Sequence, residues 1–532
     1  MEQALKQTLI DAGIKFVRIL WCDNANIIRA KAAHIDYLEE YIDNGVGITV
    51  AQMALPVMYD SVVADTGLGP VGEVRLMPDW STLTILPFAE GHAQVLSDMI
   101  ISETGKVWVH CPRGFLKRQV GRLEKMGLML KAVFENEFFL LSRNAQGALE
   151  PADNTVFCAT GAMNLHRALI IDLTDALIAQ GLEVEGYYPE SGPGQQEVNI
   201  RYAEAMPAAD RQIIYRETVR GEAARHGLIA SFLPKIFEDK AGSGCHLNFS
   251  LWRAGKNISG DPQQATAISP EAGAFIAGIL DHLPALCALT IPSKTSYRRI
   301  QPHFWAGAFR AWGHQNREAA VRVCKNKQGT RASRFEYKTM DATANPYIAL
   351  GALIAAGLDG LGRNLELPEE VTVDPALISG AQRRAGKIDR LPQNLGAALD
   401  ALRKDTVLRE AMGAELARSY MAVRQHEWDN LKELNLEEEV EGNFTPGTVT
   451  GETATIPVSD LAPGDVNFFD FQRGAGNGRL YYTLHLDSFL MADSVDAVSR
   501  GMTVQRVYYD AACDPETENC VPIDSIAAGQ QV

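Results

Sequence analysis

The apolar and polar positions of the first hundred residues alternate as they do in short, half-buried strands. Residues 15–21 read Lys-Phe-Val-Arg-Ile-Leu-Trp, and the runs at 82–87 and 93–97 are also strand-like. Side chains that alternate with a period of two point to opposite faces of a sheet. An opening helix over residues 2–12 precedes the first strand. We therefore predict a small mixed α/β domain over residues 1–104.

A larger α/β part follows over residues 105–440. Pro112 stands where a helix begins, because proline is tolerated in a first helical turn. Residues 129–141 have the pattern of a long strand, and alanine- and leucine-rich stretches at 346–361 and 395–432 predict helices. The mixture indicates an α+β protein of more than one domain, in agreement with a length of 532 residues.

The last segment, residues 441–532, differs in composition from the rest. It holds 13 Asp and Glu residues and 4 arginines but no lysine, so it carries −9 of the formal net charge of −16. Strand-like runs occur at 480–486 and 503–509. We predict an acidic, β-rich C-terminal appendage, and no pattern in it indicates a catalytic role.

The overall composition narrows the class of protein. Hydrophobic residues make up 46% and charged residues 22%, which is typical of globular domains. The net charge of −16 argues against a nucleic-acid partner, which would call for a basic face. We find no apolar run of membrane-spanning length and no signal pattern at the N-terminus, so we expect no membrane partner and a cytoplasmic location.

Two glutamates on the predicted strand at 129–141 are the first candidates for chemistry. Glu135 and Glu137 are two residues apart, so both carboxylates lie on one face and can share a cation. A solvated strand face is the alternative. The flanking Phe134 and Phe138 disfavour it, because they indicate a strand that is covered on its other side.

Further candidate ligands lie in two glycine-rich stretches. Glu190 and Glu197 bracket Ser-Gly-Pro-Gly-Gln-Gln, and a tight turn there would let the two carboxylates converge. His246 follows the run Gly242-Ser-Gly-Cys, whose glycines allow the backbone to approach a ligand closely. Surface glutamates on a turn and a structural histidine are the alternatives.

An arginine-dense region completes the set of candidates. Guanidinium groups suit phosphate oxygens, and hard oxygen ligands suit Mg²⁺. The chain has neither a Walker-type nor a Gly-x-Gly-x-x-Gly motif before a helix, which disfavours those nucleotide folds. The arginines are Arg298, Arg299, Arg310, Arg317, Arg322, Arg331 and Arg334.

Five motifs in fixed order resemble the catalytic domain of the glutamine synthetase superfamily. They are residues 134–138, 190–197, 242–246, 316–322 and 334–338. The resemblance covers about residues 10–440, and the stretches at 301–309 and 312–319 are similar to the fungal FluG and plant nodulin branch. It implies a β-grasp-like N-terminal domain, a catalytic α/β domain, and a homo-oligomeric ring, a dodecamer, with each active site between neighbouring subunits.

The resemblance also implies roles for individual residues, with ATP as a substrate and Mg²⁺ or Mn²⁺ as the metal. Glu137, Glu190 and Glu197 would bind one ion, and Glu135, His246 and Glu336 a second. The nucleotide-contacting positions are Glu185, Asn248, Ser250, Arg317, Arg322, Arg331 and Arg334. Gly242, Arg299 and Lys338 match positions that hold glutamate. Arg317, Arg322 and Trp305 are the expected catalytic residues.

Departures from the family pattern bear on the second substrate. Trp305 stands where true glutamine synthetases carry a flap glutamate, and residues 49–56 lack the acidic loop that helps to bind ammonium. Ala241 and Lys338 replace an asparagine and an arginine. A pocket that loses both carboxylates suits an organic amine, apolar or aromatic, better than NH₄⁺. We therefore expect a ligase that joins the γ-carboxylate of glutamate to an organic amine.

Two other functions remain open from the sequence. The first is a conventional glutamine synthetase that uses another general base. The second is a ring-forming scaffold or sensor that has lost turnover. The six intact metal-ligand positions argue against the scaffold, whereas Ala241 and Lys338 keep it open.

Overall fold

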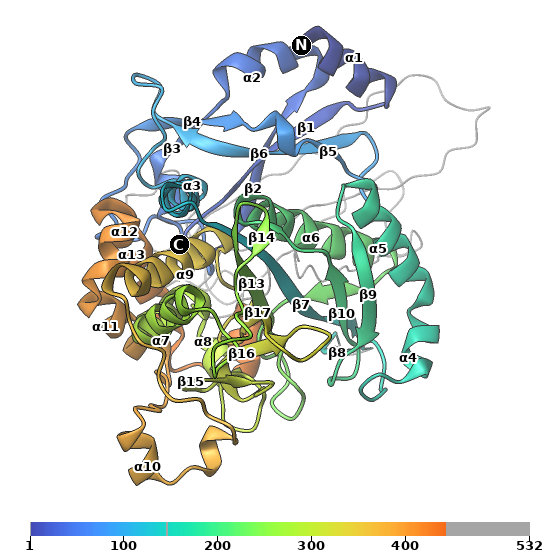
Figure 1. The fold of residues 1–532 in the computed structure, drawn as a ribbon. Coiled ribbons are helices and arrows are strands. Elements are labelled where there is room, and N and C mark those ends of the chain that lie inside the picture. The colour runs from blue at the N-terminus through green and yellow to red at the C-terminus, as the bar shows by residue number, and fades with distance from the viewer. Residues whose placement is uncertain (1, 145–146, 443–532) are drawn as a thin grey trace, which may run out of the picture. The chain divides into compact units, whose positions relative to one another are not determined.

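The computed structural model describes residues 2–144 and 147–442, and a six-stranded sheet forms its N-terminal part (Figure 1). Its elements are α1 (Glu2–Asp11), β1 (Phe16–Cys22), β2 (Ile28–His34), α2 (Leu38–Asn44), β3 (Val46–Thr49), β4 (Glu73–Pro78), β5 (Thr84–Ile85) and β6 (His92–Ile100). The main strand order is β2-β1-β6-β4-β3, and β5 also pairs with β6. β1 runs parallel to β6 and antiparallel to β2.

The strands predicted in this part are confirmed, with one that is shorter than expected. Val17 and Ile19 are fully buried in β1, as the alternation at 15–21 predicts. The strand predicted at 82–87 is only β5, two residues long. A 3₁₀ turn at Trp80–Thr82, which the Asp79 side chain caps, occupies its start, and Pro87 has no N–H to extend its end.

The second sheet has eleven strands, and the long β7 lies in its middle. The main order is β15-β16-β17-β13-β7-β10-β9. The strands are β7 (Met129–Arg143), β8 (Leu149–Pro151), β9 (Val184–Pro189), β10 (Gln195–Ile200), β11 (Ala203–Glu204), β12 (Ile229–Ser231), β13 (Cys245–Arg253), β14 (Lys256–Asn257), β15 (Phe309–His314), β16 (Ala319–Lys325) and β17 (Ala332–Tyr337). The strand predicted at 129–141 is confirmed as β7.

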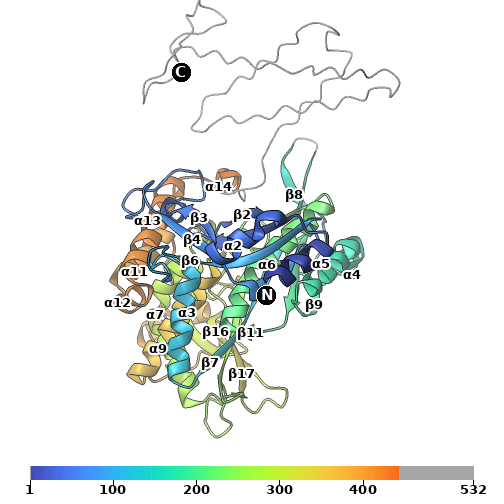
Figure 2. The same ribbon diagram turned by 90° about the horizontal axis from the view of Figure 1, so that it is seen from above.

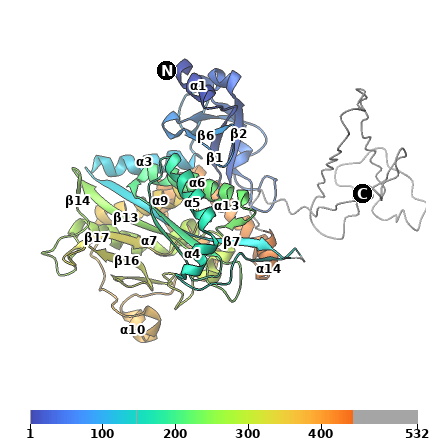
Figure 3. The same ribbon diagram turned by 90° about the vertical axis from the view of Figure 1, so that its right-hand side faces the viewer.

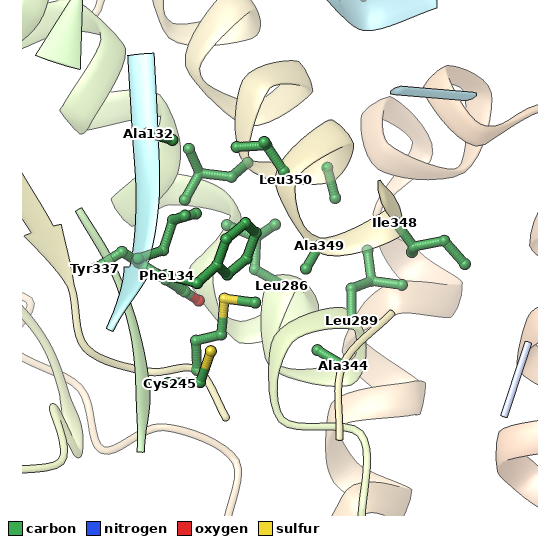
Figure 4. Packing of buried hydrophobic residues seen from close by; sticks show 14 of the residues in the cluster. Ala132, Phe134, Cys245, Leu286, Leu289, Tyr337, Ala344, Ile348, Ala349 and Leu350 are labelled. Carbon is green, nitrogen blue, oxygen red and sulfur yellow. The ribbon is translucent and has the colours of Figure 1, made fainter. Parts of the chain in front are cut away.

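Helices cover one face of this sheet and enclose the main core. They include α3 (Pro112–Lys125), α6 (Ala205–Arg225), α7 (Pro270–Thr290) and α9 (Pro346–Arg363). Figure 4 shows Phe134 and Tyr337 from the sheet beside Leu286 of α7 and Leu350 of α9. The backbones of α7 and α9 touch, since a Cβ placed on Gly278 would lie 2.7 Å from the amide nitrogen of Gly360. This packing holds the sheet rigidly from one side.

The remaining helices lie around this core. They are α4 (Thr160–Leu165), α5 (Arg167–Ala179), α8 (Lys294–Arg299), α10 (Gly380–Ala385), α11 (Leu395–Lys404), α12 (Thr406–Met412), α13 (Ala414–Leu431) and α14 (Leu436–Gly442). Figure 2 shows α11, α12 and α13 on the side opposite α4 and α5. In Figure 3 the N-terminal strands lie at one end of the described residues and α10 at the other.

The helical region predicted at 395–432 consists of three helices rather than one. Asp405 ends α11, and its side chain caps α12 by accepting from the Leu408 amide. Gly413, with φ of 90°, separates α12 from α13. The backbone conformation at Gly413 is one that L-residues rarely adopt, so the glycine explains the break. The β-rich appendage predicted for 441–532 lies outside the described residues, apart from the end of α14.

The helix α7 is unusually apolar. Among the described residues, α7 is long and apolar enough to cross a membrane by length and composition alone. Its most apolar window is 89% buried inside the fold. α7 is therefore the central core helix, and its apolar character is explained by packing on all sides.

Arg113 of α3 joins the N-terminal sheet to α6 in the larger part of the fold. Its guanidinium, with 5% of the side chain exposed, bonds Asp79 at 2.7 Å and Asp98 at 3.0 Å, both in or beside the N-terminal sheet. It also bonds Asp210 of α6 at 2.9 Å. Asp98 also pairs with Lys117, whereas Asp79 and Asp210 have no other ion pair within the described residues, so loss of Arg113 would leave two carboxylates without a cationic partner.

We therefore predict that Arg113→Met destabilises the fold by about 3–5 kcal/mol, the usual effect of removing one partner from a buried ion pair. The urea midpoint of unfolding measures the change. Arg122→Met, on the same helix but bonded only to Gln119, is the matched control and should change the midpoint little. Equal midpoints for the two variants would contradict this role for Arg113.

Candidate active site

One face of β7 packs against the core, and its other face carries candidate site residues. Phe134 and Phe138 are buried in the core, and Asn136 bonds Gln212 of α6 at 2.7 Å. Glu135 and Glu137 alternate with these residues and therefore lie on the opposite face of the sheet, away from α6. The spacing of two thus gives both carboxylates a common, partly covered face.

The first group of candidate ligands comprises Glu137, Glu190 and Glu197. Glu197 of β10 lies directly opposite Glu137 of β7 in the antiparallel register. Glu190 arrives through a tight turn, in which its amide donates to the Gln195 carbonyl at 2.8 Å. One oxygen from each carboxylate lies within 4.8 Å of the others. The structure therefore brings together three residues that the sequence spreads over 61 positions.

The second group comprises Glu135, His246 and Glu336, which come from β7, β13 and β17. His246 is the register partner of Glu135, and its Nδ1 lies 3.3 Å from Glu336 Oε1. The ligand atoms of all three lie within 4.8 Å of one another. His246 Nδ1 is also 4.0 Å from Glu137 Oε1, so the two groups adjoin.

The glutamates of the first group repel one another in a buried setting. Burial and the charge of Glu137 raise the pKa of Glu197 to about 8. Burial and the charge of Glu190 raise the pKa of Glu137 to about 7. Tyr188 donates to Glu197 at 2.6 Å, and the Gly244 amide donates to Glu137 at 2.7 Å, so both side chains are held in place. Carboxylates so held and crowded fit a hard divalent cation such as Mg²⁺.

Glu336 has a different environment. Burial alone would raise its pKa, but the charges of Lys338 and Arg322 lower it to about 2. Lys338 Nζ lies 3.3 Å from Glu336, and Arg322 donates to the other carboxylate oxygen. Burial and the adjacent Lys338 lower the pKa of His246 well below its usual value, so the imidazole is neutral and able to bind a metal. The second group therefore combines a charged carboxylate with a neutral nitrogen ligand.

The residues expected to hold glutamate surround His246. A Cβ placed on Gly242 would lie 2.7 Å from Arg299 Cγ, so the glycine lets the arginine side chain pass. Arg299 is 4% exposed, donates to the Met340 carbonyl at 2.7 Å, and keeps a buried Nε without a hydrogen-bond partner. Lys338 Nζ lies 3.4 Å from His246 Nε2. Two cations thus stand beside the candidate metal ligands.

A cleft of about 680 Å³ adjoins Glu135. Four of the expected nucleotide-contacting residues line it, namely Glu185, Asn248, Ser250 and Arg334. Tyr187, Tyr202 and Trp252 line it as well, and the sequence reading did not single them out. Lys131 Nζ lies 4.2 Å from the centre of the Trp252 ring. Aromatic walls of this kind suit a planar base, and the alternation of β13 could have indicated Trp252.

Some arginines of the arginine-dense stretch lie at the candidate site, and others lie away from it. Arg322 contacts Glu336. Burial raises the pKa of Glu190, and the charge of nearby Arg317 partly opposes that rise. Arg331 lies in the exposed turn before β17 and does not line the cleft. Arg298 and Arg310 bond Glu439 and Asp389 instead of site residues. Only part of the arginine-dense stretch therefore faces the candidate site.

A flap over residues 301–307 carries Trp305. His303 and Trp305 have positive φ values of 66° and 55°, so the loop holds a conformation that ordinary residues rarely adopt. The Trp305 side chain is 59% exposed, and the Arg317 guanidinium lies 5.8 Å from its ring centre. Arg317 connects the flap to the Glu190 side of the site.

Glu318 is a carboxylate in this region that the sequence reading missed. Its Oε1 accepts from the Trp305 amide at 2.8 Å, while its buried Oε2 has no hydrogen-bond partner among the described residues. Burial raises its pKa. Glu318 lies between Arg317 and Ala319, inside the motif at residues 316–322, and this position could have indicated that it belongs to the site.

Two family models together match most of the described residues. A family model described as glutamine synthetase, catalytic domain, matches residues 109–442, and one described as glutamine synthetase N-terminal domain matches residues 7–108. The chain is 39% identical over 438 residues to gamma-glutamylpolyamine synthetase GlnA3 of Streptomyces coelicolor, covering 81% of this chain and 93% of that protein. It is 36% identical to a glutamine synthetase of Thermus thermophilus, covering 68% and 82%.

Two solved structures are similar over most of the chain. A structure described as a novel glutamine synthase homolog has a TM-score of 0.71 and 31% identity, covering 80% of this chain and 96% of that one. A complex of GmaS with ADP has a TM-score of 0.71 and 28% identity, covering 82% and 98%. The likeness spans both the N-terminal sheet and the catalytic sheet.

Metal dependence follows from the crowded glutamates. Carboxyl groups whose pKa rises on folding contribute stability at low pH, and this contribution is lost as pH rises from the usual 4.5 through about 7 and 8. The metal-free protein should therefore lose thermal stability between about pH 5 and pH 8.5, and Mg²⁺ or Mn²⁺ should restore it.

Glu197→Gln should flatten this pH dependence and reduce the gain in melting temperature from Mg²⁺, because it removes one of the repelling charges. Glu150→Gln, an exposed glutamate on β8, is the control and should behave as wild type. Scanning calorimetry in EDTA and in Mg²⁺ measures both effects. An unchanged Mg²⁺ response in Glu197→Gln would rule out this group as the ion site.

Proposed function

The chain belongs to the glutamine synthetase family, and on that premise we propose that it joins the γ-carboxylate of glutamate to an organic amine at the expense of ATP. The family assignment makes it a carbon–nitrogen ligase that uses ATP and Mg²⁺ or Mn²⁺. The observation that carries the choice of amine is Trp305, which stands exposed on the flap in place of an expected carboxylate. The relative named as a gamma-glutamylpolyamine synthetase supports an amine as substrate.

The reaction has two balanced steps. An oxygen of the γ-carboxylate attacks the γ-phosphorus of ATP, the bond to the bridging oxygen breaks, and ADP leaves. The amine nitrogen then attacks the acyl carbon, the carbon–oxygen bond to phosphate breaks, and the proton lost by nitrogen departs with inorganic phosphate. Bound divalent ions would screen the negative charge of the transferred group.

We assign the side chains to these steps by their positions. The ion ligands would be Glu137, Glu190 and Glu197 at one ion and Glu135, His246 and Glu336 at the other. Arg322 and Arg317 would stabilise the phosphoryl group as it passes between oxygens. The nucleotide would lie in the cleft lined by Glu185, Asn248, Ser250 and Arg334, with Arg331 closing over it. Gly242, Arg299 and Lys338 would hold glutamate beside the ions.

The flap supports an organic amine on physical grounds. An exposed indole offers an apolar face to an alkyl or aryl amine but cannot accept a proton from ammonium. Because Arg317 lies over the Trp305 ring, that face stands close to the place where the acyl phosphate forms. An amine that contacts Trp305 is therefore positioned to attack.

Glu318 favours a second candidate function, a conventional glutamine synthetase. Its buried Oε2 has no partner among the described residues, and it lies behind the Trp305 backbone. A carboxylate there could attract NH₄⁺ if the flap moved aside. The two ligand groups speak against a scaffold without turnover, since buried like charges are costly to keep for structure alone.

The finer architecture is also part of the proposal. We propose that residues 1–104 form a β-grasp-like domain, residues 105–440 the catalytic domain and residues 441–532 a β-rich appendage. We further propose a cytoplasmic homo-oligomeric ring, a dodecamer, with sites between neighbouring subunits. Tyr59, Val62 and Val71 support an interface on the N-terminal part, because these apolar residues are 46%, 39% and 89% exposed there.

The choice of amine is tested at Trp305. Wild type should release phosphate faster with benzylamine or butylamine than with ammonium, at equal concentration near neutral pH. Trp305→Glu should shift the ratio of kcat/KM values toward ammonium by roughly fivefold, because an aromatic contact contributes about 1 kcal/mol. Phe304→Glu, which changes the neighbouring exposed aromatic, is the control and should shift the ratio less.

Efficient glutamine synthesis by wild type, together with no turnover of any organic amine, would overturn this reading of Trp305. Glu318→Gln then decides the alternative, since a loss of ammonium-dependent activity would identify Glu318 as the carboxylate that serves NH₄⁺.

Assembly is tested at the exposed apolar residues. Val71→Asp should weaken the ring, because it places a charge on a surface that we expect to be covered. Sedimentation should show smaller species, and activity should fall with them. Tyr37→Asp, which alters an exposed aromatic elsewhere on the N-terminal part, is the comparison. A fully active monomer would contradict shared sites.

A further inference from the structure

A second cavity lies on the side of the catalytic sheet that carries the helices. It measures about 400 Å³ and is lined by the β1–β2 turn (residues 25–28), α6, β12 and α13. α6 packs against the face of β7 opposite Glu135 and Glu137, as the bond from Asn136 to Gln212 shows. None of the candidate ion, nucleotide or glutamate residues lines this cavity.

Its lining holds three guanidinium groups with spare donors. Arg216, Arg220 and Arg424 each have a buried Nε without a hydrogen-bond partner among the described residues. Arg216 and Arg424 are only 2% and 3% exposed. These enclosed Nε atoms do not face the cavity, but each terminal nitrogen of a guanidinium carries two N–H groups, so the arginines that line the cavity keep further donors for a ligand.

Other bonds hold these guanidiniums in place. Arg216 donates to the Ala342 carbonyl at 2.9 Å and to Asn26 Oδ1 at 3.1 Å. Arg424 donates to Glu427 at 2.8 Å, and Arg220 donates to Glu217 at 3.0 Å. The three guanidiniums are therefore fixed in position, which lowers the entropic cost of binding a ligand.

The charges of the lining do not cancel. Glu427 and Glu217 pair with Arg424 and Arg220, and Lys294 pairs with Glu439. Arg216 forms no ion pair within the described residues. The nearby Cys22 thiol cannot compensate it, because burial raises the pKa of Cys22 to about 12 and keeps the thiol neutral. One positive charge in the cavity is left without an anion.

The rest of the wall is apolar. Phe232, Leu233 and Val57 line the cavity together with Trp428 and Leu431 of α13. The Arg220 guanidinium lies 5.5 Å from the centre of the Phe232 ring, so the charged and apolar parts of the wall adjoin. A ligand that fits both would carry one negative group and an apolar body.

We propose that this cavity is a second ligand site, which binds a small organic monocarboxylate through Arg216, Arg220 and Arg424 and packs the apolar body of the ligand against Phe232 and Trp428. A bidentate or shared carboxylate would satisfy the spare donors and compensate Arg216. The volume is that of an ordinary small-molecule site. The site is independent of the active site and of the amine that the enzyme uses.

The test uses 4-phenylbutyrate as the probe on the full chain, with saturating L-glutamate present to fill the active site. Calorimetry should show saturable binding, and the probe at about 10 mM should raise the melting temperature. The neutral amide 4-phenylbutyramide and inorganic phosphate should bind far more weakly, since one lacks the charge and the other lacks the apolar body.

Variants locate the binding. Arg220→Gln should raise the Kd roughly tenfold, as expected for the loss of a charged hydrogen bond. Ala224→Trp, at the rim of the cavity, should block binding without removing a contact. Arg211→Gln, on the same helix but outside the cavity, is the matched control and should bind as wild type.

Several results would overturn the proposal. These are no saturable binding, equal binding of the amide or of phosphate, competition by L-glutamate, or unchanged binding in both Arg220→Gln and Ala224→Trp. Ligase activity is measured in parallel, so loss of the probe site with retained turnover separates this inference from the proposed function.

Discussion

Crowding of negative charge on one face of an antiparallel sheet is the constraint on which this structure depends. Glu135, Glu137, Glu190, Glu197 and Glu336 gather there, and the nearby cations do not neutralise them evenly. Arg322 and Lys338 both contact Glu336, whose pKa falls to about 2, while the pKa of Glu197 rises to about 8. The folded chain thus holds charge that a divalent cation, rather than the protein itself, is suited to compensate.

Such a site needs a rigid support, and β7 supplies it from its other face. Phe134 and Phe138 are buried in the main core, and Asn136 bonds α6. Successive residues of β7 therefore alternate between packing against the core and facing the candidate site. The register of the neighbouring strands then positions the other candidate ligands, because Glu197 lies opposite Glu137 and His246 lies opposite Glu135. A slip of one residue would turn both partners toward the core.

The flap beside the candidate site is built differently. The flap at 301–307 is a loop with positive φ values at His303 and Trp305, and its aromatic side chains are exposed. Residues 301–305 of the loop are partly or fully exposed, so their side chains can differ while the candidate ion ligands stay as they are. The Glu318 carboxylate behind the Trp305 backbone is the physical link between the flap and β16.

The sequence by itself determined the local elements and the type of chemistry. Alternation predicted β1 and β7, Pro112 marked the start of α3, and the spacing of Glu135 and Glu137 placed two carboxylates on one face, because these features depend only on neighbouring residues. The tertiary structure decided what depends on distant pairing. It separated Arg298 and Arg310 from the site, placed Trp252 and Glu318 in it, and divided the 395–432 region at Asp405 and Gly413. It also left Arg216 without a counter-charge, because burial and hydrogen bonding between separate segments do not appear in any local pattern.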